Sequence, residues 1–264
     1  MTLEKATRTF GWRVYGLGVM TVGLACLAFG DFDPGQPVPE HFPARTVLAY
    51  ASGVWMVVAA AAVEWGRTAV WGAAALTVYY ALCVVVLMNG RLLLTDYAVF
   101  VTYENIAMQL AIAAAALIVY ATSANIDAAL AARLTRLGQL AFGVCLLVFG
   151  GAHFVYMNLT APLVPKWLPP TQTFWGYATG MGFVAAGFAI LAGVQARFAA
   201  ILVTAMLACF GLLANGRILL ANPSLHENWT ESTVNLAVTG AAWVVADSLA
   251  RTRRPESGAR CWCE

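Results

Sequence analysis

The sequence predicts an all-α integral membrane protein, and its composition carries that prediction. Of its 264 residues, 61% are apolar and only 11% are charged. Soluble domains are about 45–50% apolar and about 25% charged. A chain of this length cannot bury so much apolar surface in its own interior, so much of that surface must face lipid. The composition therefore excludes a disordered chain, a nucleic-acid-binding domain and a disulfide-rich secreted module.

Eight apolar segments are long enough to cross a bilayer as helices. Each has 17–21 residues, is apolar on most faces and is rich in Gly and Ala, as is typical of helices packed within a membrane. The expected spans are 12–30, 46–63, 68–88, 104–121, 137–156, 173–192, 198–214 and 230–248. Because eight is even, both termini are expected on the same side of the membrane.

Basic residues are distributed unevenly between the two sides. Eleven of the 15 Lys and Arg residues lie on the side of the termini, and four lie opposite (Arg45, Arg91, Lys166 and Arg217). Because short cytoplasmic connections are enriched in Lys and Arg, both termini are expected in the cytoplasm of a bacterial-type plasma (inner) membrane. All three histidines and seven acids lie toward the outer side. Any functional site is therefore expected to face outward.

The chain contains an internal repeat of four helices. Residues 89–94 (Asn-Gly-Arg-Leu-Leu-Leu) recur as 215–220 (Asn-Gly-Arg-Ile-Leu-Leu), an offset of 215 − 89 = 126, whereas the first and fifth helices match at 120. Four spans return the chain to the same side, so two parallel bundles related by an axis along the membrane normal are expected. The expected parts are a first repeat (1–121), a cytoplasmic linker (122–136), a second repeat (137–248) and a cytoplasmic tail (249–264).

The second half carries a proline-flanked signature. It reads Gly-Gly-Ala-His-Phe at 150–154, Leu-Val-Pro-Lys-Trp-Leu-Pro at 163–169 and Phe-Trp-Gly-Tyr-Ala-Thr-Gly at 174–180. These residues resemble the DoxX-like family of four-helix membrane proteins, and the first half follows only through the repeat. The resemblance implies two tandem DoxX-like bundles. It also implies functions found among members of that family, which include quinone-dependent sulfur oxidation, thiol redox partnerships and cofactor maturation.

The cysteines do not favour a thiol relay. Cys26, Cys83, Cys145 and Cys209 stand singly inside predicted helices, where a cysteine is typically a small packing residue. The tail pair Cys261 and Cys263 is compatible with metal binding, with acylation or with no function. No spacing places two metal ligands on one helical face, so no metal site is predicted.

The repeated Asn-Gly-Arg motif supplies one set of candidate ligand-binding residues. It stands at the outer end of the third and seventh spans and comprises Asn89, Arg91, Asn215 and Arg217. A guanidinium suits planar acceptors such as carboxylate or quinone oxygens, so both arginines are expected to hold ligand oxygens. In the structural alternative, Gly ends the helix and Arg reaches the lipid headgroups.

His153 is the candidate for proton exchange, because imidazole titrates near neutral pH. It lies 153 − 137 = 16 residues into the fifth predicted span, roughly 24 Å along a helix. An ionisable group at that depth usually lines a cavity or has a buried partner.

Two acids and two amides complete the candidate set. Glu104 and Glu231 stand at the starts of the fourth and eighth spans, where they would couple a site to solvent. Alternatively, residues 228–231 (Asn-Trp-Thr-Glu) form a capping box. Gln109 and Asn235 lie about one turn further in, and either bond a neighbouring helix or line an outer pocket with the arginines and the histidine.

These features favour a membrane redox component whose outward-facing pockets bind a quinone or a similar small oxidised ligand. If the chain is an enzyme, it is expected to be a subunit of a quinone-linked oxidoreductase. The sequence has no haem, flavin or iron–sulfur signature, so electrons are expected to come from a separate periplasmic partner protein. The lipid bilayer is the other expected partner, and nucleic acid is not.

A non-catalytic assembly or maturation factor, which holds a periplasmic client or a metal with its outer loops, is the alternative. That hypothesis predicts that Arg91, Arg217 and His153 tolerate alanine. Transport is a third hypothesis, and parallel repeats suit it. It lacks the chain of ionisable groups across the midplane that a charged substrate would need.

Overall fold

The computed structural model describes residues 10–251, and all regular structure in that part of the chain is helical. Eight helical spans are long and apolar enough to cross a membrane, which confirms the predicted polytopic, all-α class. Six spans have one label each: α1 (Gly11–Phe29), α2 (Arg45–Glu64), α5 (Phe100–Ser123), α6 (Ala128–Val155), α8 (Gln172–Ala192) and α11 (His226–Arg251). The predicted tail beyond residue 251, with Cys261 and Cys263, lies outside the described residues.

The third and seventh spans are each built from three segments. The third consists of α3 (Ala69–Val78), the π-helix η2 (Tyr79–Asn89) and α4 (Gly90–Thr95). The seventh consists of α9 (Ala196–Phe210), the π-helix η4 (Gly211–Asn215) and α10 (Gly216–Ala221). Both π-helices end at the Asn of the repeated Asn-Gly-Arg motif, and both helices continue through its Gly. The structural alternative, in which this Gly ends the helix, is therefore wrong.

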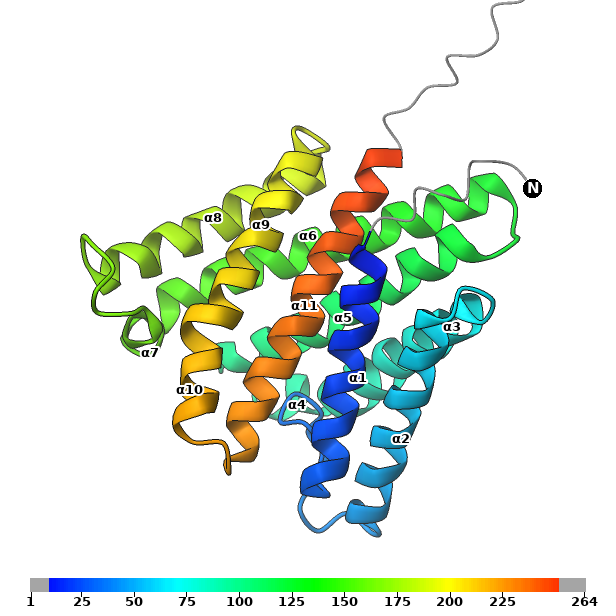
Figure 1. Ribbon diagram of the computed structural model, residues 1–264, viewed down its shortest axis with the longest axis horizontal. Helices are drawn as coiled ribbons and strands as arrows, with labels where there is room; N and C mark the ends of the chain where they lie inside the picture. The colour runs from blue at the N-terminus through cyan, green and yellow to red at the C-terminus, as the bar shows by residue number, and fades with distance from the viewer. Residues whose placement is uncertain (1–9, 252–264) are drawn as a thin grey trace, which may run out of the picture.

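Consecutive spans pack side by side around the molecule, and the last span closes on the first (Figure 1). α5 and α11 also pack against each other, so they occupy the centre. In their most apolar windows, 61% of α5 and 72% of α11 is buried, against 17–50% in the other spans. These two helices are the fourth helix of each half.

The first helix of each half packs against the fourth helix of the other half. In α1, a Cβ on Gly18 would lie 2.5 Å from the Ala237 backbone of α11. In α6, a Cβ on Gly138 would lie 2.8 Å from the Ala114 carbonyl oxygen of α5. Gly18 and Gly138 are 120 residues apart, the offset that relates these two helices in sequence. Glycine is needed at both positions because the backbones approach too closely for any side chain.

Two predicted boundaries differ from the structure. The expected linker 122–136 is helical except at 124–127, because α6 begins at Ala128 and the Asp127 carboxylate accepts a hydrogen bond from Leu130 N at 3.0 Å. The predicted capping box at 228–231 is wrong, since α11 already begins at His226. The Asn228 side chain instead donates to the Asn222 carbonyl at 2.9 Å.

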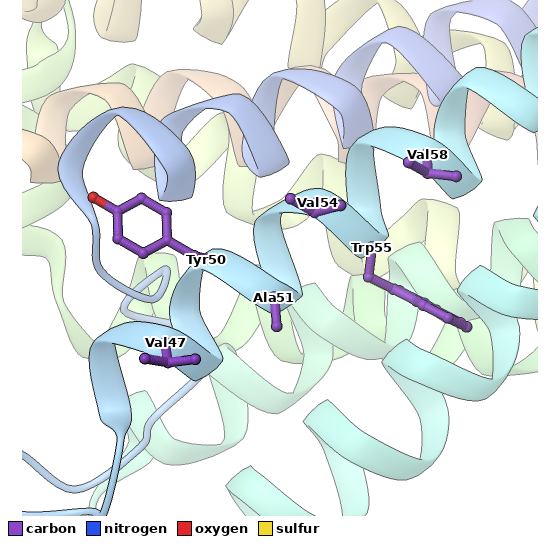
Figure 2. A pocket seen from close by; sticks show the side chains of 6 residues that line it. All are labelled: Val47, Tyr50, Ala51, Val54, Trp55 and Val58. Carbon is purple, nitrogen blue, oxygen red and sulfur yellow. The ribbon is translucent and has the colours of Figure 1, made fainter.

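A shallow hollow of about 530 Å³ runs along one side of α2. Figure 2 shows that its lining residues all come from this helix: Val47, Tyr50, Ala51, Val54, Trp55 and Val58. The lining is apolar apart from a tyrosine hydroxyl and an indole nitrogen. In a membrane-spanning helix such a surface suits lipid acyl chains, and it offers no group for chemistry.

Candidate functional site

A turn from the connection between α1 and α2 enters the interior of the molecule. Residues 33–36 read Asp-Pro-Gly-Gln, and this polar sequence favours a β-turn. The turn is closed by a bond from Gln36 N to Asp33 O at 2.7 Å, and Gly35 N donates to Asp33 Oδ1 at 2.7 Å. Although both are polar, the Asp33 and Gln36 side chains are only 3% and 1% exposed. The surrounding helices must therefore supply their hydrogen bonds.

Residues of the third span hold this turn in place. Asn89 Nδ2, at the end of η2, donates to the Gly35 carbonyl at 2.9 Å and to the Val84 carbonyl at 3.0 Å. The Tyr79 hydroxyl, at the start of η2, donates to Gln36 Oε1 at 3.0 Å. The first and the last residue of η2 thus both hydrogen-bond to the turn.

Gln109 of α5 bonds the same turn from the central helix. Its Nε2 donates to Asp33 Oδ1 at 3.5 Å. The amide also lies so close to Gly35 that a Cβ at that position would collide with Gln109 Nε2. A side chain at residue 35 would therefore displace the Gln109 amide from its position beside the turn.

Three oxygens around this turn are buried and have no hydrogen-bond partner: Asp33 Oδ2, Asn89 Oδ1 and Gln109 Oε1. Both amides have a defined orientation because their nitrogens face carbonyl or carboxylate oxygens, which only accept hydrogen bonds. In each of these carboxyl and amide groups, one terminal atom hydrogen-bonds within or to the turn and the other is the free oxygen. We call this group of three side chains, with residues 33–36, the Asp33 centre.

The one ionisable side chain of the Asp33 centre is the Asp33 carboxyl. Burial raises the pKa of the Asp33 carboxyl to about 7, the Gly35 and Gln109 hydrogen bonds lower that pKa, and the negative charge of Glu231 raises it. Glu104 of α5 and Glu231 of α11 also interact electrostatically with each other. Within residues 10–251, no ion pair neutralises any of these three carboxyls. Of the two acids that the sequence singles out, Glu231 therefore acts on Asp33 directly, and Glu104 acts on Glu231.

The second half of the predicted repeat keeps one of the three side chains of the Asp33 centre and differs at the other two. The offset of 126 relates Asn89 to Asn215 and Gln109 to Asn235, and the offset of 120 relates Asp33 to His153. His153 lies on α6, and its Nδ1 is 2.9 Å from the Phe149 carbonyl. The imidazole stacks on Phe210 at 6.1 Å and meets the edge of Phe183 at 5.3 Å between ring centroids.

The two amides of the second half are less enclosed than those of the first. Asn215 Nδ2 donates to the Glu231 carbonyl at 3.2 Å. Asn235 Oδ1 lies beside Gly211, where a Cβ would be 2.8 Å away, and Gly211 directly follows Phe210. No hydrogen bond of the Asn235 side-chain amide is found in the described part of the chain, and the residue is half-buried. We call His153, Phe183, Phe210 and Asn235 the His153 cluster.

Arg91 and Arg217 are not bonded to either group. Both side chains are exposed on the short helices α4 and α10. Between residues 10 and 251, neither guanidinium has a hydrogen bond or an ion pair. The structure thus brings Asn89 and Gln109 to the Asp33 turn. His153, Asn215 and Asn235 lie in the second half, where Glu231 bonds Asn215 through its carbonyl. The structure leaves the two arginines at the surface.

Sequence reasoning missed Asp33 and Gln36. The available signal was the Asp-Pro-Gly turn in a connection that is otherwise rich in proline. In the residues that the structure describes, no group of three or more His, Cys, Asp or Glu is arranged to hold a metal ion.

Comparison with known proteins identifies one similar family. No curated protein and no solved structure matches the chain. The family model covers the second half, the part that carries the DoxX-like residues, and the resemblance to the DoxX-like family stays a prediction. The chain is a polytopic membrane protein whose residues 142–250 are similar to a domain of unknown function (DUF8561).

Proposed function

We propose that the protein is a quinone-linked redox component of the membrane and that the His153 cluster binds the ligand. The observation that carries the proposal is the half-buried imidazole held between phenylalanine rings within a membrane-spanning helix. His153 lies in the last turn of α6 and its imidazole is half-buried there. Ionisable side chains within membrane spans are typically functional. In this proposal the chain is two tandem repeats with both termini in the cytoplasm, and the cluster faces the outer side.

The tautomer of His153 makes the free nitrogen a proton acceptor. A carbonyl oxygen only accepts hydrogen bonds, so Nδ1 must carry the proton that bonds Phe149 O. In the neutral ring Nε2 is then unprotonated. No partner of Nε2 is found among the described residues, so a ligand hydroxyl can donate to it.

A quinol matches these groups. Its aromatic ring suits the faces of Phe183 and Phe210, and its hydroxyl suits His153 Nε2. The Asn235 amide offers a second polar group, because its Oδ1 lies beside Gly211, the residue that follows Phe210. When the quinol is oxidised, Nε2 takes one hydroxyl proton, solvent takes the other, and both electrons go to a partner redox protein. In the reverse direction the same partner supplies the electrons.

Quinone content tests this proposal. We would purify the full chain in mild detergent, extract it with organic solvent and measure quinone per polypeptide. The variant His153→Leu removes both ring nitrogens, and with them the acceptor for the ligand hydroxyl, and His41→Leu is the matched control at an exposed histidine. Near-stoichiometric quinone is expected in the wild type and in His41→Leu, with at least a tenfold loss in His153→Leu.

The double variant Arg91→Ala/Arg217→Ala distinguishes this site from the arginine site that the sequence predicts. It keeps its quinone if the His153 cluster is the site and loses it if the guanidinium groups hold the ligand oxygens. Quinone at the level of bulk lipid carry-over in every sample would overturn the proposal. That result would favour the assembly factor and a search for a client at the outer loops.

A further inference from the structure

We propose that the Asp33 centre is a binding site for a monovalent cation, for which sodium is the probe. The centre lies in the other half of the repeat from the His153 cluster. The inference is independent of the quinone proposal.

The first argument is the set of free atoms. Asp33 Oδ2, Asn89 Oδ1 and Gln109 Oε1 are all acceptors, and their side chains are 3%, 0% and 1% exposed. A buried oxygen without a partner costs free energy, and three such oxygens around one four-residue turn are unusual in a native fold. A ligand that satisfies all three must be a cation or a hydrogen-bond donor.

The second argument is charge. A buried carboxyl must either be protonated or have a compensating positive charge, and no basic side chain pairs with Asp33 among residues 10–251. Glu231 adds negative charge nearby and strengthens the need. One positive charge neutralises the single carboxylate of the centre.

The third argument is ligand chemistry, which favours a hard cation of low charge. Carboxylate and amide oxygens suit hard cations, whereas nitrogen and thiolate ligands select zinc or copper. Calcium takes 6–8 oxygens and is usually held by several carboxylates, and magnesium keeps its own waters. One carboxylate with two neutral amides instead matches the charge of sodium or potassium.

The fourth argument is the backbone around the site. Ion sites in membrane proteins commonly form where a spanning helix departs from regular α-geometry, and π-helical segments are frequent at functional sites. Asn89 ends an 11-residue π-helix. The turn at 33–36 comes from an outer connection, so it carries Asp33 to the ion from the outer side. Cation binding would also fix this connection against η2 and α5.

Sodium binding to the purified full chain tests the proposal. We would measure equilibrium binding of radioactive sodium, and the melting temperature in sodium chloride against choline chloride at equal ionic strength. Saturable binding of one sodium per chain and a sodium-dependent rise in melting temperature are expected, because a ligand that binds only the folded state stabilises it. Hydrogen exchange of residues 30–44 should slow when sodium is added.

Three variants locate the site. Asp33→Asn removes the charge and should abolish saturable binding and the sodium-dependent rise in melting temperature. Gln109→Met keeps the side-chain volume but removes the oxygen, and should weaken binding at least tenfold. Asp96→Asn makes the same substitution as Asp33→Asn at an exposed acid of the outer side and should bind as the wild type does.

The outcomes separate clearly. Saturable binding of potassium or ammonium in place of sodium, lost in Asp33→Asn, supports a monovalent cation site. Saturable binding of calcium or magnesium without binding of any monovalent ion overturns the proposal that the cation is monovalent. Absence of saturable binding of any of these ions to folded wild type overturns the proposal. So does wild-type sodium binding in Asp33→Asn. If Asp33→Asn fails to fold, Gln109→Met decides. None of these results depends on quinone content.

Discussion

Asn89 and Asn215 end the π-helices of the two halves, yet their amides bond different partners. Asn89 Nδ2 donates to two carbonyls, those of Gly35 and Val84, at 2.9 and 3.0 Å. Asn215 Nδ2 donates to one, that of Glu231, at 3.2 Å. The first half uses its Asn to hold an inserted turn, and the second half uses it to join two helices at a half-exposed edge.

The two asparagines are therefore expected to differ in their contribution to stability. Asn89→Ala leaves the Gly35 and Val84 carbonyls without these donors in a buried site, and each such loss costs about 1–3 kcal/mol. Asn215→Ala removes one bond where lipid headgroups or water can compensate, so its cost should stay below about 1 kcal/mol. Denaturation of the detergent-solubilised variants measures both changes. Equal destabilisation would contradict the difference in burial.

Gly240 is expected to be intolerant of substitution because α1 and α11 touch along their backbones. A Cβ at Gly240 would collide with the backbone of Tyr15. Gly240→Ala should thus destabilise the fold by about 1–3 kcal/mol through overpacking. Gly182→Ala is the matched control, because its Cβ would meet only the flexible Met206 Sδ at 3.6 Å. The interhelical contact would be disproved if the two variants had equal melting temperatures.

Asp33 should make stability depend on pH in sodium-free buffer. Burial raises its pKa from the ordinary value of 3.8 to about 7. The folded state therefore keeps a proton that the unfolded state releases, so this contribution is full below about pH 4 and is lost as the pH rises through 7. Asp33→Asn should remove the dependence. The charged and titratable groups that interact with Asp33 are Glu231, Cys26, Tyr79 and Tyr80.

Sodium should reverse this trend. The cation binds the ionised carboxylate, so the sodium-dependent rise in melting temperature should be larger at pH 8 than at pH 5. Melting curves at the two pH values, in sodium and in choline, measure the effect. A rise that is larger at pH 5 would be incompatible with a site built on Asp33.

The proposed orientation predicts which connections an impermeant maleimide can reach in intact cells. His41→Cys lies in the first outer connection and should be labelled. Arg67→Cys lies in the next connection, on the opposite side, and should be labelled only after permeabilisation. Both positions are exposed in the structure, so access depends on the membrane alone. Labelling of Arg67→Cys in intact cells would contradict the proposed orientation and favour the opposite one.

The sequence predicts the spans well because a 20-residue apolar run has few alternatives in lipid. It predicts less where tertiary packing decides the local structure. Gly90 and Gly216 lie within continuous helical backbone, although Gly is a poor helix former. The four-residue turn at 33–36 is polar and looks exposed in sequence. Its burial depends on partners at Tyr79, Asn89 and Gln109, far along the chain.

The candidate site shows the same limit. The repeat pairs Asn89 with Asn215 and Gln109 with Asn235 in the sequence alone, and the structure brings Asn89 and Gln109 to one turn. Arg91 shares a motif with Asn89, but neighbouring helical residues point in different directions, so motif membership does not place both in one site. Spacing identifies the polar residues, and packing decides which of them meet.

The contact between α1 and α11 has a consequence for how the chain is made. Gly11 N donates to Asp247 Oδ2 at 3.3 Å across 236 residues of sequence. α1 is therefore synthesised long before α11, and the face that it turns to α11 stays uncovered until α11 has been made. The insertion machinery or lipid must cover that face until α11 arrives. A chain truncated before α11 never forms this contact, so its α1 lacks a main packing partner. Such a chain is expected to be degraded by membrane proteases.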